Sequence, residues 1–333
     1  MSEALLLLPL DVEPARLAGP AVPELTVLEG ATMGTRWSLR LGGPVDPKAV
    51  RGLVQGAFDA VVGEMSQWEP DSELSRFNRA DPGTWHALSP GFAHVLRAGL
   101  ALAAKTGGAF DPTLGAVVDL WGFGPFVSRQ LPPAPAALAA ARACSGWDRI
   151  RFDAAAGRAR QPGGLRLDFS GIAKGHGADR AALALERAGY SAFLLEVGGE
   201  LVARGLRSDG YPWWVDIETP PDARLEPVRI GLTGMAVATS GDYRRFVEIG
   251  GQRFAHTIDP RSGTPLESAL PSVTVLHREC MIADALATAM TVLGGERGIA
   301  LAEDADAAAI LVLRDGDRWV RRLSSRARAM AEA

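Results

Sequence analysis

The chain has 333 residues, of which 47% are hydrophobic and 22% charged, so it can bury a substantial core and is not disordered over most of its length. Acidic and basic residues are interspersed and the net charge is −4, which excludes the basic stripe of a nucleic-acid-binding protein. With 5 histidines and 2 cysteines, the chain offers little for a His- or Cys-based metal site. Cys144 and Cys280 stand far apart, which indicates two unpaired thiols in a reducing compartment, with a single disulfide as the alternative.

The N-terminus bears on where the chain resides. The apolar stretch at residues 4–8 ends at Pro9 and Asp11, and Glu3 stands where a signal peptide needs a basic residue. The stretch is also too short for a secretory core, and no cysteine follows that could carry a lipid. No segment approaches the ~20 apolar residues of a membrane helix. We therefore expect a cytoplasmic chain without a membrane span, although a chain that had lost its signal would look the same.

The first half of the chain predicts an extended lead-in and then helices. Residues 1–30 are rich in Pro, Ala and Leu without a clear period, and residues 33–41 alternate like a strand. Helices are predicted over residues 47–65 and 90–105 and, after a proline-rich surface loop at 125–135, up to residue 144.

The second half predicts mostly strands, interrupted by helices over residues 175–188 and 279–293. Glycine pairs and Asp-Gly between apolar runs predict hairpins at residues 250–251 and 315–316. Strands are predicted over 193–202, with 213–217 adjacent to it, and over 243–249, 253–258, 272–276, 307–313 and 319–323.

Strand runs joined by hairpins, with few helices between them, predict an α+β fold with mostly antiparallel sheets and packed helices. No composition break marks a domain boundary. We expect one domain over residues 31–325, either undivided or made of two subdomains. Residues 326–333 are expected to form a frayed tail.

A first candidate site is the strand-turn-helix segment at residues 167–180. A strand ends at Asp168, a glycine-bearing turn follows, and the helix begins near Gly175. Free backbone N–H groups and the positive helix end favour an anion there, and Lys174 adds a charge. The spacing is not that of a Walker A loop, and such turns also occur without any ligand.

A second candidate site combines Asp284 and Thr288, which lie one turn apart on one face of an otherwise apolar helix. Carboxylate and hydroxyl oxygens suit a hard cation such as Mg²⁺. The alternative is structural, with the threonine bonded back to its own helix and the aspartate capping a loop.

The remaining candidates lie near predicted turns. His256 ends a strand just before the turn formed by Asp259, Pro260 and Gly263, where a catalytic group or a structural histidine could stand. The segments 65–78 and 107–124 place aromatic residues beside turns, where a ring can stack on a flavin or cover a core.

These segments, in this order, resemble the ApbE family of FAD:protein FMN transferases from about Met33 to Gly295. No single motif carries the resemblance, but their number and order are specific. The matching motifs are Met33-Gly-Thr35, Ser72-Glu-Leu-Ser-Arg-Phe-Asn78, Phe110-Asp-Pro-Thr113, Leu120-Trp-Gly-Phe-Gly124, Asp168 to Gly175, Val197-Gly-Gly199, Thr239-Ser-Gly-Asp242, His256 to Pro260 and Ala283-Asp-Ala-Leu-Ala-Thr288.

The resemblance implies a tunnelling-type α+β fold, FAD as substrate, Mg²⁺ as cofactor and an acceptor protein flavinylated on Thr or Ser. It implies that His256 is the general base. Mg²⁺ would be bound by the Asp284 and Thr288 side chains and the Gly171 carbonyl. The FAD site would comprise Met33, Trp68, Ala109, Phe110, Asp111, Asp168 and Lys174.

Three positions depart from the family pattern without removing a proposed catalytic group. Trp68 stands where Tyr is common, His176 replaces an aromatic residue, and Glu196 precedes Val-Gly-Gly in place of an amide or apolar residue. Two other functions stay open, an FAD pyrophosphatase that uses water as nucleophile and a flavin-binding carrier without turnover.

Overall fold

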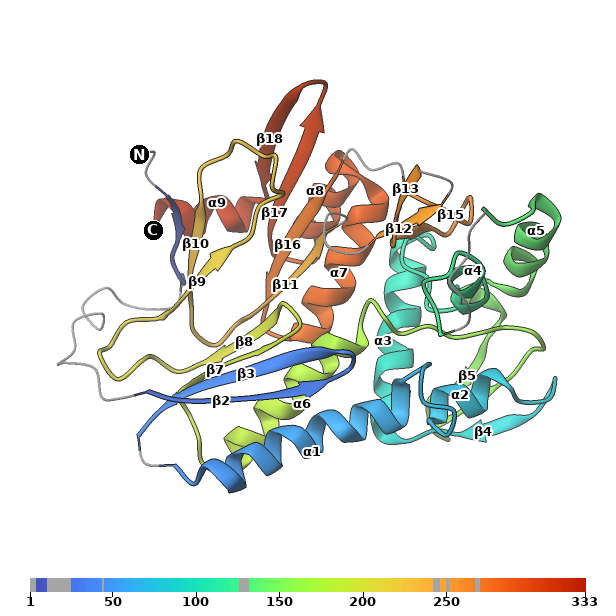
Figure 1. The fold of residues 1–333 in the computed structure, drawn as a ribbon, viewed down its shortest axis with the longest axis horizontal. Helices are drawn as coiled ribbons and strands as arrows, with labels where there is room; N and C mark the ends of the chain where they lie inside the picture. Colours follow the sequence, from blue (N-terminus) through green and yellow to red (C-terminus); the bar gives the residue numbers. More distant parts are fainter. Residues whose placement is uncertain are drawn as a thin grey trace. The chain divides into compact units, whose positions relative to one another are not determined.

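The computed structural model describes residues 4–10, 25–43, 45–125, 132–241, 246–249, 252–266 and 270–333. The chain forms two compact units (Figure 1). The first comprises Met1–Asp59, Lys174–Gly241 and Ala269–Ala333, and the second comprises Ala60–Ala173 and Asp242–Ser268.

The first unit is built on an eight-stranded sheet in which every neighbouring pair is antiparallel. Its strands stand in the order β18-β17-β16-β11-β8-β7-β3-β2. Their bounds are β2 Leu25–Thr32, β3 Thr35–Gly42, β7 Phe193–Val197, β8 Glu200–Arg204, β11 Ala236–Gly241, β16 Ser272–His277, β17 Ala308–Asp315 and β18 Arg318–Leu323.

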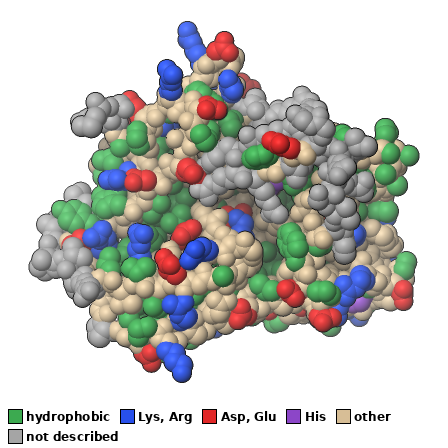
Figure 2. All heavy atoms as spheres, viewed as in Figure 1, with side chains coloured by type: hydrophobic (Ala, Val, Ile, Leu, Met, Phe, Trp, Pro, Cys, Tyr) green, Lys and Arg blue, Asp and Glu red, His purple; other side chains and the backbone are tan. Residues whose placement is uncertain are grey.

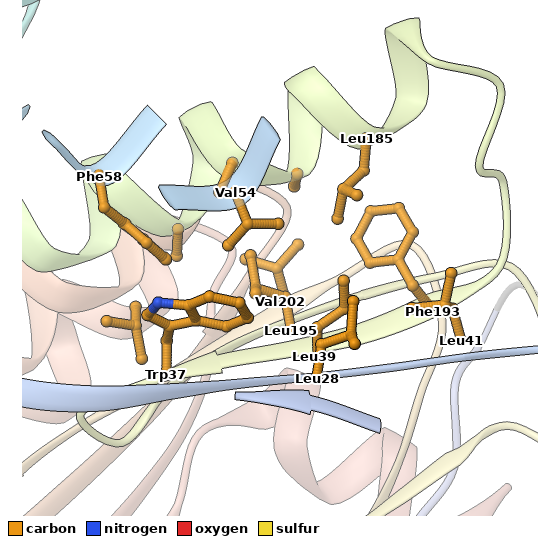
Figure 3. Close-up of a cluster of buried hydrophobic side chains, with 14 of the residues drawn as sticks. Leu28, Trp37, Leu39, Leu41, Val54, Phe58, Leu185, Phe193, Leu195 and Val202 are labelled. Atoms are coloured by element: carbon orange, nitrogen blue, oxygen red, sulfur yellow. The ribbon is translucent and has the colours of Figure 1, made fainter. Parts of the chain in front are cut away.

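Helices α1 (Pro47–Met65) and α6 (Ala173–Arg187) cover one face of this sheet. Figure 3 shows Val54, Phe58 and Leu185 pointing from the helices toward Trp37 and Leu195 on the strands. All five side chains are almost fully buried. The helical period of α1 and the two-residue period of the strands thus place apolar faces against one another, as the sequence pattern predicts.

The opposite face of the sheet packs on a three-stranded sheet and the C-terminal helix. Alternation along the strands directs Leu194 and Ala203 to this face, where they join Ile230 and Met330 in a second core. The covering elements are β1 Leu5–Leu7, β9 Trp213–Ile217, β10 Val228–Leu232 and α9 Ser325–Glu332.

Helix α7 (Cys280–Leu293) packs on β11 and β16 and is followed by α8 (Gly295–Asp304). Most of α7 is buried, in keeping with its apolar sequence. Its first two backbone N–H groups, of Cys280 and Met281, both donate to the carboxylate of Asp179 at 2.9 Å. Asp179 therefore replaces a local N-cap for the helix that carries Asp284 and Thr288.

The second unit is mainly helical, with short strands. Phe92 lies at its centre, 5.1 Å from Phe169 and 6.5 Å from Phe77 between ring centroids. Its helices are α2 Glu73–Asn78, α3 Pro90–Thr106, α4 Gly115–Leu120, α5 Pro135–Cys144 and the 3-10 turn η2 Trp147–Arg149. Its strands are β4 Trp85–Ala87, β5 Arg151–Asp153, β6 Arg158–Arg160, β12 Phe246–Ile249, β13 Gln252–Ala255, β14 Ile258–Asp259 and β15 Thr264–Pro265.

The predicted α+β class with mostly antiparallel sheets is confirmed, and each predicted helix is present. Helix α3 begins at an N-cap, Ser89, and ends at Gly107, whose left-handed φ of 60° suits only glycine well. Among the described residues, no helix combines the length and apolar character needed to cross a bilayer. On the face shown in Figure 2, acidic and basic side chains are interspersed.

Three expectations differ from the structure. The lead-in contributes strands β1 and β2, because partners distant in sequence pair with them. Strand β9 pairs with β10 in the smaller sheet and not with the 193–202 strands. The tail is helical, because Ser324 caps α9 and Ala327 and Met330 are buried. Parts of the predicted loop (126–131), the hairpin turn 250–251, Asp242 and Tyr243 lie outside the described residues.

Candidate functional site

Lys174 and Glu200 form an ion pair in the first unit. Lys174 lies in the first turn of α6, and its ammonium donates to Oε1 of Glu200, the first residue of β8. The Lys174 side chain is 33% exposed, whereas that of Glu200 is 2% exposed. The positive charge at the start of α6 is therefore anchored by a buried carboxylate, and the Lys174 side chain is the more exposed of the two.

Asp284 of α7 lies beside this pair. Its Oδ2 accepts a hydrogen bond of 3.1 Å from the backbone N–H of Gly175, one of the free donors of the α6 N-terminus. Within the described part of the chain this is the one hydrogen bond that Asp284 accepts, which leaves Oδ1 for a ligand. The capping role that sequence left as an alternative is thus present, but it occupies one oxygen only.

Thr288, one turn after Asp284, contacts Ser240 at the end of β11, with 3.4 Å between the two hydroxyl oxygens. By contrast, Thr291 on the same helix donates back to the carbonyl of Ala287 at 2.8 Å. The backbone-bonded alternative therefore describes Thr291 and not Thr288. Asp284, Thr288 and Ser240 together form an oxygen-rich corner on α7 and β11.

The charges in this cluster perturb one another. Burial raises the pKa of Glu200 to about 7, with Lys174 opposing this shift and Asp284 adding to it. Burial likewise raises the pKa of Asp284, against the charge of Lys174 and the Gly175 N–H. The carboxylates of Glu200 and Asp284 raise the pKa of Lys174 against the effect of its own burial. Two buried carboxylates thus share the charge of one lysine in this cluster.

Met33 stands in the tight turn between β2 and β3. Its φ of 48° is unusual for a residue with a side chain, and Gly34 follows with a φ of 69°. The Met33 side chain packs on the core under α6, where its Cε would lie 2.9 Å from a Cβ at Gly177. Any contact of Met33 with a ligand is therefore made from a half-buried position.

Three predicted motifs converge on Asp168 in the second unit. The amide of Asn78 exchanges two hydrogen bonds with the backbone of Leu167, at 2.9 and 2.7 Å. The Asp168 N–H donates to the carbonyl of Pro112 at 2.9 Å, and its carboxylate accepts from the Ser170 N–H at 2.7 Å. Segments far apart in the sequence thus hold Asp168 and the turn that follows it, which contains Gly171.

Asp119 is a further carboxylate near Asp168. It pairs with Arg166 at 2.7 Å, its side chain is 10% exposed, and its Oδ1 has no hydrogen-bond partner. Burial raises its pKa to about 6, with Arg166 opposing and Asp168 adding. A Cβ on Gly124 would come within 1.7 Å of that Oδ1, which explains the last glycine of the Leu-Trp-Gly-Phe-Gly motif.

Asp111 is held by the turn that follows α3. Its Oδ1 accepts from both the N–H and the hydroxyl of Thr113, at 2.8 and 2.6 Å. Burial raises its pKa against these hydrogen bonds. Ala109 and Phe110 are each 5% exposed, so their side chains belong to the core of this unit.

Trp68 is 49% exposed, which leaves its indole free to stack. The segment just after α1 is fixed because the hydroxyl of Ser66 accepts from the N–H groups of Trp68 and Glu69. The neighbouring Gln67 donates to the hydroxyl of Ser170 at 3.3 Å. The exposed ring is therefore attached to a segment that contacts the Asp168 turn.

His256 is half-buried between β13 and β14. The Leu266 N–H donates to the carbonyl of Thr257, and the indole of Trp121 donates to the carbonyl of Gly263 at 2.8 Å. Trp121 also packs on Phe254, with ring centroids 5.4 Å apart. The Leu-Trp-Gly-Phe-Gly segment thus contacts β13 before His256 and the β14–β15 turn after it.

The oxygen-rich corner fits Mg²⁺ by its chemistry. In the described ranges, no group of three or more His, Cys, Asp or Glu side chains that could hold a metal occurs. One carboxylate with hydroxyls suits Mg²⁺, which usually keeps several waters and takes phosphate oxygens as further ligands.

The structure is that of a two-unit α+β protein. In its first unit, Lys174 at the N-terminus of α6 lies beside the oxygen-rich corner. A family model described as "ApbE family" matches residues 33–311, and the chain belongs to this family. It is 37% identical over 314 residues to the FAD:protein FMN transferase of Vibrio cholerae, covering 93% of this chain and 94% of the relative. The Haemophilus influenzae protein of that name is also 37% identical, covering 92% and 91%.

Solved structures agree with this assignment. The structure named flavin transferase ApbE from Vibrio cholerae matches with a TM-score of 0.86 and 36% identity, covering 92% of this chain and 99% of that one. The apo flavinyl transferase ApbE of Pseudomonas stutzeri matches with a TM-score of 0.85 and 34% identity, covering 94% and 98%. The expected ApbE-like fold is confirmed.

Glu200 and Asp119 were not singled out from the sequence, and Ser240 was noted only as part of the motif Thr239-Ser-Gly-Asp242. Glu200 carried a usable signal, because a carboxylate at a core-facing strand position needs a partner. The pairings of Ser240 and Asp119 gave no such signal, since their partners, Thr288 and Arg166, lie 48 and 47 residues away in the chain.

Proposed function

We propose that this chain transfers the FMN half of FAD onto a Thr or Ser hydroxyl of an acceptor protein and releases AMP, with Mg²⁺ as cofactor. Membership of the ApbE family and the curated relatives support an enzyme of the flavin-transferase type. The observation that carries the proposal is the cluster of Lys174, Asp284 and Thr288, which offers a fixed positive charge beside oxygens suited to a hard cation.

The chemical problem is attack on a pyrophosphate, whose negative charge repels a nucleophile. The acceptor oxygen forms a bond to the phosphorus of the FMN half while the bond from that phosphorus to the bridging oxygen breaks. AMP leaves with the bridging oxygen, and the product is FMN joined to the acceptor through a phosphoester. Lys174 is proposed to stabilise the charge that builds on the phosphate oxygens.

His256 is proposed to accept the proton of the acceptor hydroxyl on an imidazole nitrogen. A neutral imidazole suits this role near neutral pH, and such a base contributes typically 10²–10⁴-fold. The contacts of Trp121 with Phe254 and Gly263, on either side of His256, would help to keep the imidazole oriented.

Mg²⁺ is proposed to be held by Asp284 Oδ1, the Thr288 hydroxyl and the carbonyl of Gly171. When bound, it would neutralise phosphate oxygens and orient the bond that breaks. The Gly175 N–H, by bonding to the other oxygen of Asp284, would orient that carboxylate as a ligand.

The remaining FAD contacts are proposed at residues whose side chains or backbone are accessible or well fixed. Trp68 offers an exposed ring for stacking, and Asp111 and Asp168 offer carboxylates fixed by backbone N–H groups. Met33, Ala109 and Phe110 would contribute through half-buried or backbone positions.

Two other outcomes are distinguished by product analysis. The purified chain is incubated with FAD and Mg²⁺, with and without an acceptor flavoprotein, and nucleotides are separated by chromatography. The proposal predicts that AMP appears only with the acceptor and in equal amount to bound flavin. AMP together with free FMN would indicate a pyrophosphatase, and intact FAD throughout would indicate a carrier.

A further inference from the structure

Glu200 occupies a position that the strand pattern reserves for apolar residues. It follows the tight turn of Gly198 and Gly199, whose φ values are 59° and 103°, and opens β8. Alternation directs Glu200 and Val202 to the face covered by α1 and α6, where Val202 is part of the apolar core. A carboxylate on this face loses its hydration, so its presence needs an explanation.

The contacts of Glu200 point toward Lys174. Oε1 accepts from the Lys174 ammonium, while Oε2 is buried with no hydrogen-bond partner. Lysine has a four-carbon stem with many rotamers, and one buried acceptor removes much of this freedom. The Lys174 side chain is the more exposed of the two, and an ammonium that donates once to Glu200 has two further protons to donate.

Stability alone does not account for this pair. Replacing a buried ion pair by apolar residues of similar volume is often neutral or stabilising, because desolvating two charges offsets their attraction. Since stability does not require this pair, an action of Lys174 on a ligand offers another reason for it.

We propose that Glu200 is a positioning residue, which holds the Lys174 ammonium in the orientation that binds the pyrophosphate of the dinucleotide. The inference rests on the proposed function, because it takes FAD as the ligand of Lys174. Glu200 acts through Lys174 and does not itself touch the phosphates. A charge fixed before the substrate binds costs no reorganisation during binding or reaction.

A double-mutant cycle tests this coupling. Lys174→Met, Glu200→Leu and the double variant are compared with the wild type for FAD affinity in EDTA, by flavin fluorescence, and for thermal unfolding. Each single substitution is expected to weaken FAD binding by about tenfold or more. The double variant is expected to bind no more weakly than Lys174→Met and to unfold at the same or a higher temperature.

Losses that multiply in the double variant, or unchanged FAD affinity in Glu200→Leu, would overturn the inference. The variant Glu200→Gln separates the hydrogen bond of Glu200 from its charge. The amide oxygen can still accept from Lys174, but the side chain no longer neutralises the ammonium charge. Positioning predicts weaker or equal FAD binding by Glu200→Gln, whereas a carboxylate that merely offsets the lysine charge predicts tighter binding.

Glu196 provides a matched control on the same hairpin. It lies on the opposite face, and its carboxylate accepts from the Ser38 hydroxyl and the Gly199 N–H. Glu196→Gln is expected to leave FAD affinity unchanged. If the wild type neither binds FAD nor transfers FMN, the proposed function fails, whereas multiplying losses in an active wild type overturn only the role of Glu200.

Discussion

Gly175 of α6 donates its backbone N–H to the carboxylate of Asp284 on α7, across 3.1 Å. This contact needs a residue without a side chain, because a Cβ at position 175 would lie 2.4 Å from the carbonyl oxygen of Cys280. We expect Gly175→Ala to force the two helices apart and lower FMN transfer by at least about tenfold, since a small misplacement of reacting groups is costly.

The control for Gly175→Ala must be a glycine whose backbone alanine can adopt. Gly189, just after α6, does not meet this condition, because its φ of 91° is strained for alanine. Gly56→Ala is the better control, since a Cβ there meets nothing within 4 Å. Initial rates of acceptor labelling compare the two variants. Equal rates for Gly175→Ala and wild type would show that the close approach of the helices does not matter to the reaction.

Two threonines on α7 separate a ligand role from a structural one. Thr288 faces Ser240, whereas Thr291 bonds back to its own helix. Thr288→Val is expected to raise the Mg²⁺ concentration needed for half-maximal transfer by about tenfold or more. Thr291→Val should leave that concentration unchanged, and a magnesium titration of both variants that gives equal shifts would contradict the assignment.

Two exposed tryptophans provide a similar comparison in the second unit. Trp68 and Trp85 are 49% and 44% exposed, and the guanidinium of Arg158 already covers Trp85. Stacking of an aromatic ring contributes on the order of 1 kcal/mol, so Trp68→Ala is expected to weaken FAD binding about five- to tenfold. Trp85→Ala should bind FAD as the wild type does, and isothermal titration measures both.

Asp119 predicts a pH dependence of stability. Burial raises its pKa from 3.8 to about 6, so the folded state binds the proton more tightly than the unfolded state does. Protonation of Asp119 therefore contributes to the free energy of unfolding. This contribution is fully present below about pH 4 and is lost as the pH rises through about 6. Asp119→Asn should therefore gain about 1–3 kcal/mol relative to wild type between pH 4 and pH 8.

Urea unfolding at pH 4 and pH 8 measures this difference. Asp216→Asn is the control with the opposite sign, because Arg229 lowers the pKa of this exposed carboxyl. A constant difference between Asp119→Asn and wild type at the two pH values would mean that Asp119 is not perturbed by burial.

Local signals made the helices predictable from the sequence. Ser89 and Gly107 act on residues within one turn of themselves, and the apolar period of α1 needs no knowledge of its partner. The lead-in and β9 differed from expectation because strand partners are chosen across long separations, as in the pairing of Leu5 with Val228.

The candidate site was predictable only where its residues are close together in the sequence. The pair Asp284 and Thr288 could be found, since both stand on one helix face. Its setting could not, because the N–H of Gly175 and the hydroxyl of Ser240 come from segments 109 and 48 residues away. The ion pair of Glu200 with Lys174 was missed because the two residues meet only in the folded unit. No spacing in the sequence indicates that they are partners.

The mass of an intact acceptor flavoprotein, measured after incubation with this chain, FAD and Mg²⁺, tests the central claim most directly. The account predicts a gain equal to FMN less one water on a Thr or Ser. The gain should disappear in EDTA, and the rate should fall by about 10²-fold or more in His256→Gln while FAD still binds. An acceptor of unchanged mass, with FMN and AMP accumulating in solution, would contradict it.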